Sequence, residues 1–279
     1  MSIPACAPST APARGRVAFR RGTARAVAAA LSLAVGLGCA GGGAAKKKEE
    51  AAQRARSHYD LGVDHLQNGR VGPAIREFQA SAAIQPDDAW TQTALAEAYR
   101  RKGLMKEAET HLLRALQLDP GFQPARLNLS ALYVQLARYP EAIAEGQRLL
   151  ADPTLPTQGL VKTLTNVGYA QLRLGQRAEA RRSLEEALEY ADGFWQAQLN
   201  LGILEAEEGR TAQAITRFQR VLGAKPGPLA EAEANYRIAE IYIAQGEREE
   251  ALGHLTAAVA RKPSGEWGKR SEEYLNLLR

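Results

Sequence analysis

Small and aliphatic residues recur along most of the chain with a period close to 34 residues. The marker is an alanine that recurs at spacings of 34, 34, 38, 34 and 37 residues, at Ala74, Ala108, Ala142, Ala180, Ala214 and Ala251. A small residue stands twelve positions before each alanine, directly after an aliphatic one. Aliphatic residues at helical spacing predict amphipathic helices, and small residues are needed where two helices cross closely. We therefore predict six helical hairpins between about Ala55 and Pro263.

Turns and prolines divide each copy of this pattern into two helices. Glycine-containing turns such as Asn68-Gly69-Arg70 and Gly175-Gln176 separate the first helix from the second. Prolines close most copies, because proline lacks a backbone donor and clashes with the preceding turn. The predicted hairpins cover about 55–88, 89–122, 123–156, 161–194, 195–228 and 232–265. Two insertions, at 153–158 and at 227–229, interrupt the period.

The period and the residue types resemble the tetratricopeptide repeat (TPR). This resemblance implies an all-α fold, a right-handed superhelical solenoid of six TPR hairpins over residues 50–265 with a concave groove. A stack of repeats leaves an apolar face uncovered at its end. Residues 266–279 carry apolar side chains along one side, at Trp267, Tyr274, Leu275 and Leu278. We therefore predict that this last segment is a capping helix.

Residues 1–38 have the features of a secretory signal peptide. A segment with several arginines precedes a 13-residue run without charge, which is too short for a membrane span of ~20 residues. Leu37-Gly38-Cys39 then resembles a bacterial lipobox, so we predict lipidation at Cys39 and a flexible tether over 39–49. Ordinary signal cleavage, with the cysteine as a bystander, is the alternative. The length of the segment before the apolar run favours Val17 as the start of translation.

The formal net charge of +5 does not indicate a nucleic-acid-binding protein. Five arginines and no acidic residue lie within residues 1–38. Removing them leaves 31 of the 36 basic residues against 31 acidic ones. The exported chain would then be formally neutral and would lack the basic surface that binds DNA or RNA.

No motif in the sequence indicates an enzyme or a cofactor site. There is no glycine-rich phosphate loop, nucleophile elbow or zinc-protease motif. His58 and His65 are two candidate metal ligands in the first repeat, but no third ligand follows at a usable spacing. We interpret both as packing residues. His111 and His254 share one repeat position, which indicates a structural role.

The concave face is the candidate functional surface, because the first helix of each repeat lines it through positions 2, 5, 6, 9 and 12. Apolar and aromatic residues occupy many of these positions, which suits an amphipathic helix bound in a groove. The predicted groove residues are Tyr59, Val63, Leu66, Trp90, Ala94, Leu127, Asn128, Val134, Asn166, Tyr169 and Asn200. The alternative is that the apolar ones pack against the next repeat. The three asparagines share one repeat position, where their amides could clamp an extended peptide.

The signal, the lipobox, the six repeats and the short last helix together resemble the type IV pilus pilotins of the PilF, PilW and Tgl type. The stretch Asp152-Pro153-Thr154-Leu155-Pro156, followed by Asn166-Val167-Gly168-Tyr169, is similar to theirs. The resemblance implies a lipid-anchored protein on the periplasmic face of the outer membrane. It would bind secretin subunits and promote their assembly for type IV pilus biogenesis, without catalysis. A general TPR adaptor for another envelope machine, such as a Tad-type pilus or a protease scaffold, is the alternative.

Overall fold

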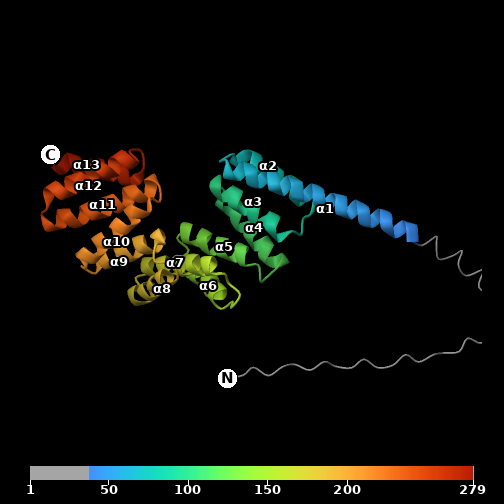
Figure 1. Cartoon of the computed structure of the whole chain (residues 1–279), viewed down its shortest axis with the longest axis horizontal. Helices are drawn as coiled ribbons and strands as arrows, with labels where there is room; N and C mark the ends of the chain where they lie inside the picture. Colours follow the sequence, from blue (N-terminus) through green and yellow to red (C-terminus); the bar gives the residue numbers. More distant parts are fainter. Residues whose placement is uncertain (1–37, 279) are drawn as a thin grey trace, which may run out of the picture. The chain divides into compact units, whose positions relative to one another are not determined.

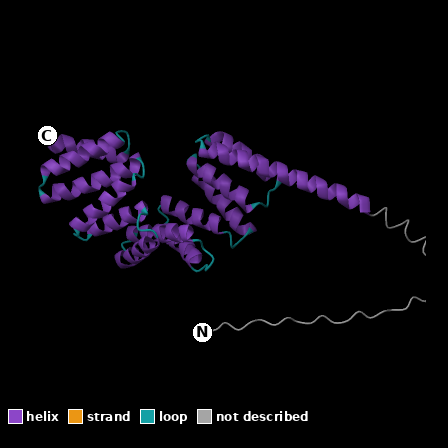
Figure 2. Cartoon of the chain, viewed as in Figure 1, coloured by secondary structure: helices purple, strands orange, loops and turns teal. Residues whose placement is uncertain are grey.

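The computed structural model describes residues 38–278, and from residue 43 onward it also describes the side chains. This part of the chain consists of helices joined by short loops and contains no strand (Figure 1, Figure 2). The helices are α1 (Gly38–Gln67), α2 (Val71–Ile84), α3 (Ala89–Arg101), α4 (Met105–Leu118), α5 (Gln123–Gln135), α6 (Tyr139–Leu150), α7 (Thr157–Arg173), α8 (Arg177–Tyr190), α9 (Trp195–Glu207), α10 (Thr211–Ala224), α11 (Pro228–Gln245), α12 (Arg248–Arg261) and α13 (Glu266–Leu278). The predicted all-α fold is confirmed.

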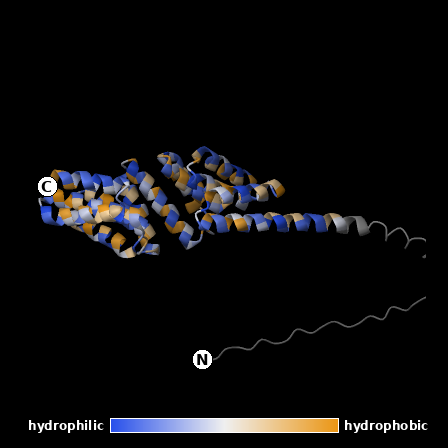
Figure 3. Ribbon diagram, turned by 90° about the horizontal axis from the view of Figure 1, so that it is seen from above, coloured by the Kyte–Doolittle hydropathy of each residue, from blue (hydrophilic) through white to orange (hydrophobic). Residues whose placement is uncertain are grey.

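Consecutive helices pair into six hairpins, from α1–α2 to α11–α12, and the marker alanines lie at the centre of this packing. All six of them are fully buried. A Cβ at Gly62 would stand 2.5 Å from the Phe78 ring, and one at Gly202 would stand 2.8 Å from the Phe218 ring. These crossings therefore need the small residues that the sequence supplies. Figure 3 shows hydrophobic and hydrophilic residues side by side along the repeat helices, as expected for amphipathic helices.

A polar contact recurs across the hairpins, between side chains 19 positions apart. It occurs in five of them, as His58–Glu77, Gln92–His111, Arg126–Glu145, Gln198–Arg217 and Asn235–His254, at distances from 2.6 to 3.0 Å. In the α7–α8 hairpin Leu164 and Ser183 take these two positions. The structural role predicted for His111 and His254 is confirmed. His58 takes part in the same contact, and residues 43–278 contain no group of three or more potential metal ligands.

The two predicted insertions lengthen the first helices that follow them. Helix α7 has 17 residues and α11 has 18, whereas α3, α5 and α9 each have 13. Gly227 precedes α11 with φ of 114°, a backbone conformation that favours glycine. Pro228 follows at the first helical position, where its missing N–H would have no helical partner anyway. The insertion thus builds a sharp start to the sixth repeat.

Helix α13 covers the end of the last repeat, as predicted for a capping helix. Trp267, Tyr274, Leu275 and Leu278 all pack into one cluster with α11 and α12. The Trp267 and Tyr236 rings have centroids 5.2 Å apart. This contact buries the apolar side of α13 and leaves its other side to solvent, which is how a terminal cap ends a stack of repeats.

The N-terminal region differs from the expected tether. The chain divides into two units at residue 51. Of the first unit the structure describes 38–51, and α1 runs through all of them, including the stretch 39–49 that we expected to be flexible. Alanine, lysine and glutamate dominate from residue 44 onward, and all three are strong helix formers. The predicted signal peptide and the Val17 start lie outside the described residues, except Gly38.

None of the described helices combines the length and the apolar character that crossing a membrane requires.

Candidate protein-binding surface

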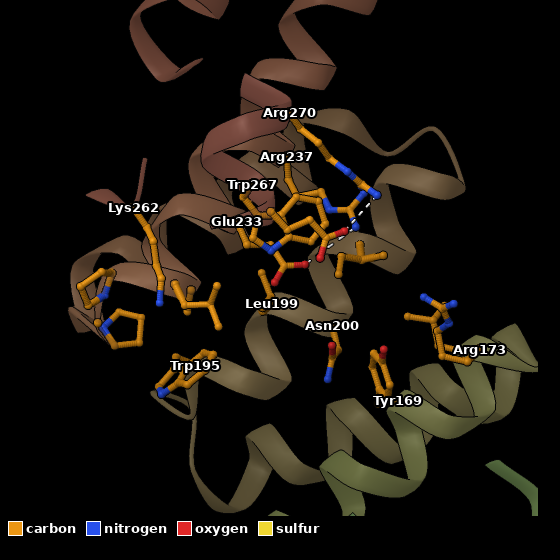
Figure 4. A pocket seen from close by; sticks show the side chains of 18 of the residues that line it. Tyr169, Arg173, Trp195, Leu199, Asn200, Glu233, Arg237, Lys262, Trp267 and Arg270 are labelled. Carbon is orange, nitrogen blue, oxygen red and sulfur yellow. Dashed lines mark ion pairs between the residues drawn. The ribbon is translucent and has the colours of Figure 1, made fainter. Parts of the chain in front are cut away.

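A cavity of about 1140 Å³ lies among the last three repeats and the capping helix. Its walls come from α7, α9, α11 and α13 and from the loop that precedes α11 (Figure 4). The first helices of repeats 4, 5 and 6 therefore share one hollow surface with the cap. The second helices of these hairpins lie behind them and supply the buried core at Leu184, Phe218 and Leu255.

The cavity is lined from the repeat positions expected to face the concave side. Tyr169 and Ile203 occupy position 9 of repeats 4 and 5, and Leu199 occupies position 5 of repeat 5. Position 6 supplies Asn200 from repeat 5 and Arg237 from repeat 6. Position 6 thus holds asparagine in repeats 3, 4 and 5 and arginine in repeat 6.

The acidic side chains of the cavity all have arginine partners. Glu266 accepts from Arg270 at 2.9 Å, while Glu233 lies 3.8 Å from Arg237 and Glu207 lies 3.9 Å from Arg177. Burial raises the pKa of Glu233, and the nearby Arg237 opposes this effect. The negative charges in the wall are therefore largely compensated by the chain itself.

Two cations at the cavity have no such partner. Arg173 and Lys262 are both exposed, and neither forms an ion pair within residues 43–278. Figure 4 shows them at opposite sides of the cavity. The compensated acids and the uncompensated cations leave the hollow with positive charge at two separate places.

Aromatic rings form much of the apolar surface between these cations. Trp267 is fixed by two guanidinium groups, with Arg237 at 4.8 Å and Arg270 at 5.0 Å from its ring centroid. Trp195 is half-buried and packs against the cluster that contains Phe218. Figure 4 shows the two tryptophans on different sides of the hollow. Both are anchored from behind, so they present rigid surfaces.

The predicted groove residues of the first two repeats serve mainly in packing. Leu66 is only 8% exposed and belongs to the core, so its expected place on an open surface is wrong. Helix α3 covers it with Leu95 and Ala98. Tyr59, Val63 and Ala94 are half-buried against the same cluster.

Trp90 is the large exposed residue of this region, at 55%. It lies edge-on to Phe122, with ring centroids 4.8 Å apart. Tyr59 and Trp90 line a small hollow of about 340 Å³ together with Ser81 and Asp88. The structure thus brings two of the predicted residues together at a modest depression.

The other predicted residues divide between packing and the large cavity. Val134 packs against the core cluster of repeats 2 and 3, and Leu127 is half-buried. Tyr169 and Asn200 line the cavity. The side chains of Asn128, Asn166 and Asn200 have no hydrogen bond to other described residues, and Asn200 is only 8% exposed at the cavity wall.

Sequence reasoning missed several residues of the cavity, chiefly Arg173, Trp195, Arg237, Lys262, Trp267 and Arg270. Two signals in the sequence point to this place. One is the arginine that replaces asparagine at position 6 of repeat 6, and the other is the insertion at 227–229 that precedes it. Trp267 was predicted as a capping residue, and it also forms part of the wall.

Two curated proteins show weak but extensive similarity. The chain is 24% identical over 243 residues to cellulose synthase operon protein C of Pseudomonas fluorescens, covering 81% of this chain and 19% of that protein. It is 24% identical over 267 residues to the outer membrane protein assembly factor BamD of Caulobacter vibrioides, covering 92% of this chain and 82% of BamD. The chain spans only 7% to 20% of the length of the first curated relatives that it matches.

Two solved structures share the fold over nearly their whole length. PilF of Pseudomonas aeruginosa matches with a TM-score of 0.65 and 20% identity, over 82% of this chain and 99% of PilF. PilW, a widely conserved type IV pilus biogenesis factor, matches with a TM-score of 0.67 and 20% identity, over 77% of this chain and 97% of PilW. At this level of identity the likeness shows the fold alone.

Family profiles agree with the repeats seen in the structure. One profile described as tetratricopeptide repeat matches residues 59–122, 93–156 and 168–228, and a second matches 205–269. These ranges include parts of all six hairpins and reach into the capping helix. Together with the buried marker alanines and the helix pairing, they establish that the chain belongs to the tetratricopeptide repeat family.

Proposed function

We propose that this TPR adaptor is a pilotin, an outer-membrane lipoprotein that binds secretin subunits and promotes their assembly for type IV pilus biogenesis. The observation that carries the proposal is the extent of the fold likeness, which covers 99% of PilF and 97% of PilW. The lipobox-like Leu37-Gly38-Cys39 and the stretch from Asp152 to Pro156 support it. The similarity to BamD, an outer membrane protein assembly factor, fits an envelope role of the same general kind.

The mechanism requires binding and delivery rather than catalysis. Acyl chains on Cys39 would hold the protein at the inner leaflet of the outer membrane, since more than one chain makes such anchoring firm. The repeats would hold a secretin segment, and the anchored complex would bring that segment to the bilayer. Tyr59 and Trp90 offer an aromatic contact for the apolar side of an amphipathic helix.

A deletion strain tests the function. We expect it to make secretin monomers that do not form heat- and detergent-resistant multimers, and pilus-dependent motility should fall accordingly. The measurement is an immunoblot of unheated envelopes for the secretin, with the wild-type gene restored on a plasmid as control. Normal multimer levels in the deletion strain would reject the pilotin proposal.

Cys39→Ser tests the anchor. The variant should lose acylation and should no longer sediment with outer membranes, because the acyl chains on Cys39 are the proposed hold on the bilayer. Intact mass and membrane fractionation measure the two effects, and Cys6→Ser is the matched control. A mass that differs from the wild type only by the cysteine-to-serine exchange, together with unchanged sedimentation, would contradict lipidation at Cys39.

The similarity to BamD favours a second candidate, an adaptor for the assembly of other outer-membrane proteins. The same deletion strain separates the two functions. Loss of secretin multimers with normal folding of other outer-membrane proteins supports the pilotin. The reverse pattern supports the general adaptor.

A further inference from the structure

We propose that the cavity of repeats 4 to 6 binds an acidic peptide segment, in which an apolar or aromatic residue lies between carboxylates. This inference deepens the proposed function and rests on it, because it names the kind of partner segment that the adaptor holds. It also places a binding site away from the first three repeats, where eight of the eleven predicted groove residues lie.

Charge gives the first argument. The acids of the wall, Glu207, Glu233 and Glu266, each face an arginine of this chain. Arg173 and Lys262 have no carboxylate partner among residues 43–278 and lie at opposite sides of the hollow (Figure 4). A ligand with carboxylates at two places along its length would compensate both cations, and its charges would set its orientation.

Arg237 is positioned in the wall of the cavity by two carboxylates of its own helix. The Nε of Arg237 is buried and has no hydrogen-bond partner, although the two terminal nitrogens of its guanidinium face Glu233 and Glu240. A buried donor without a partner costs free energy. Arg237 lines the cavity with its guanidinium held in place by both carboxylates, while its buried Nε stays out of reach of a ligand.

The apolar surface gives the argument for the middle of the ligand. Trp195, Leu199 and Ile203 line the cavity from α9, and Trp267 lines it from α13. Leu229 stands at the cavity with 53% of its surface exposed. An apolar or aromatic ligand side chain would cover these surfaces, and aromatic anchors commonly dominate such interfaces.

The site is also built to stay open. The guanidinium groups of Arg237 and Arg270 hold the Trp267 ring, and Gly227 and Pro228 fix the loop beside it. Little ordering is then needed when a ligand binds, which favours affinity. The free amide of Asn200 faces the same space and can bond an extended backbone (Figure 4).

The N-terminal segment of this chain does not fit as the occupant. Residues 1–38 contain five arginines and no acidic residue, so they would be repelled by Arg173 and Lys262. An acidic segment of a partner protein has the charge that complements Arg173 and Lys262, whereas residues 1–38 do not.

Selection from a random peptide library displayed on phage tests the inference with the whole exported chain. We expect wild-type protein to enrich peptides with two or more acidic residues around an aromatic or branched apolar one. The double variant Arg173→Glu/Lys262→Glu should lose this enrichment. The control Lys106→Glu/Arg220→Glu changes the same charges at exposed positions outside the cavity and should keep it.

A selected peptide then gives the quantitative result by fluorescence anisotropy. Its Kd should rise about tenfold or more in the double variant, because two attractive contacts become repulsive, and it should also rise with added salt. Arg173→Gln/Lys262→Gln should give a smaller rise, and circular dichroism checks that every variant is folded. Selection without acidic enrichment, or equal affinity of the double variant and the control, would overturn the inference.

Secretin itself separates this inference from the proposed function. Secretin binding that the double variant retains would leave the pilotin proposal standing and reject the cavity as its site. Acidic peptides that bind the cavity, together with no secretin binding, would support the cavity and reject the pilotin.

Discussion

Equivalent repeat positions have different roles in the first two repeats and in the last three. Position 9 is Val63 in repeat 1, where it packs on the core, and Ile203 in repeat 5, where it lines the large cavity. Position 6 is Ala94 in repeat 2 and Arg237 in repeat 6. The depression between the first repeats measures about 340 Å³, against about 1140 Å³ among the last ones. A common scaffold therefore carries a small hollow in the first repeats and a much larger one in the last three.

The difference lies in the concave residues and the insertions, while the hairpin cores are alike. Phe78 and Phe218 occupy the same position and both are fully buried. Leu66 and Leu172 share position 12 and are 8% and 7% exposed, so this position belongs to the core in both regions. The sixth repeat, by contrast, begins with the insertion at 227–229, and its first helix α11 has 18 residues against 13 in α3. A repeat protein can thus change its binding surface without altering the packing that holds it together.

The largest expected effect comes from truncating these two phenylalanines. Phe78→Ala and Phe218→Ala should each lower the free energy of unfolding by about 3–5 kcal/mol, because each leaves a cavity against a close helix crossing. Repeats contact only their neighbours, so the damage should stay local. Hydrogen exchange measured by mass spectrometry should rise in repeats 1 and 2 for the first variant and in repeats 5 and 6 for the second. If each variant instead lost hydrogen-exchange protection equally in all repeats, the two regions would unfold as one unit.

Leu66→Asp and Trp90→Ala sharpen the comparison within the first repeats. Leu66→Asp places a carboxylate in the core and should destabilise the protein by about 3 kcal/mol or more. Trp90→Ala removes an exposed ring, so it should leave thermal stability nearly unchanged. If the secretin binds there, Trp90→Ala should weaken binding by ~2 kcal/mol. Thermal melts and binding to purified secretin measure both effects, and a stable Leu66→Asp variant would contradict the core placement.

The sequence predicted the hairpins because their determinants are local and repeated. Each marker alanine and its small partner report one helix crossing, and six copies reinforce one another. The capping helix followed from the same logic, since Trp267 and Leu275 lie on one side of a short amphipathic segment. The shared repeat position of His111 and His254 also predicted their structural role, because a residue type that recurs at one repeat position usually serves the packing of the repeat.

The cavity was harder to predict because it depends on distances between repeats. Leu66 was assigned to the surface, yet position 12 faces the following repeat and is covered by it. Arg173 and Lys262 come from different helices, and only the fold places them around one hollow. The helical state of 39–49 was missed for another reason. The glycines at 41–43 suggested a tether, whereas the lysines and the glutamate at 46–49 favour a helix.

The smallest expected effect is on the pH dependence of stability. Both regions contain the same kind of histidine contact, one in repeat 2 and one in repeat 6. Burial lowers the pKa of His111 in repeat 2 and of His254 in repeat 6, and each Nδ1 bonds a side-chain oxygen, of Gln92 or Asn235. The unfolded chain therefore binds more protons than the native one as pH falls below about 6.5. Stability should be intact above that pH and should decline below it.

Glutamine substitutions test this contact in each region separately. His111→Gln and His254→Gln keep a polar group but do not titrate, so Tm should fall less between about pH 7.5 and about pH 5 than it does in the wild type. A loss of Tm that is the same at every pH would reflect the altered hydrogen bond alone. The pH slope is the informative quantity. A slope unchanged in both variants would show that other groups govern the acid sensitivity, whereas a change in only one would locate it in that half of the repeat stack.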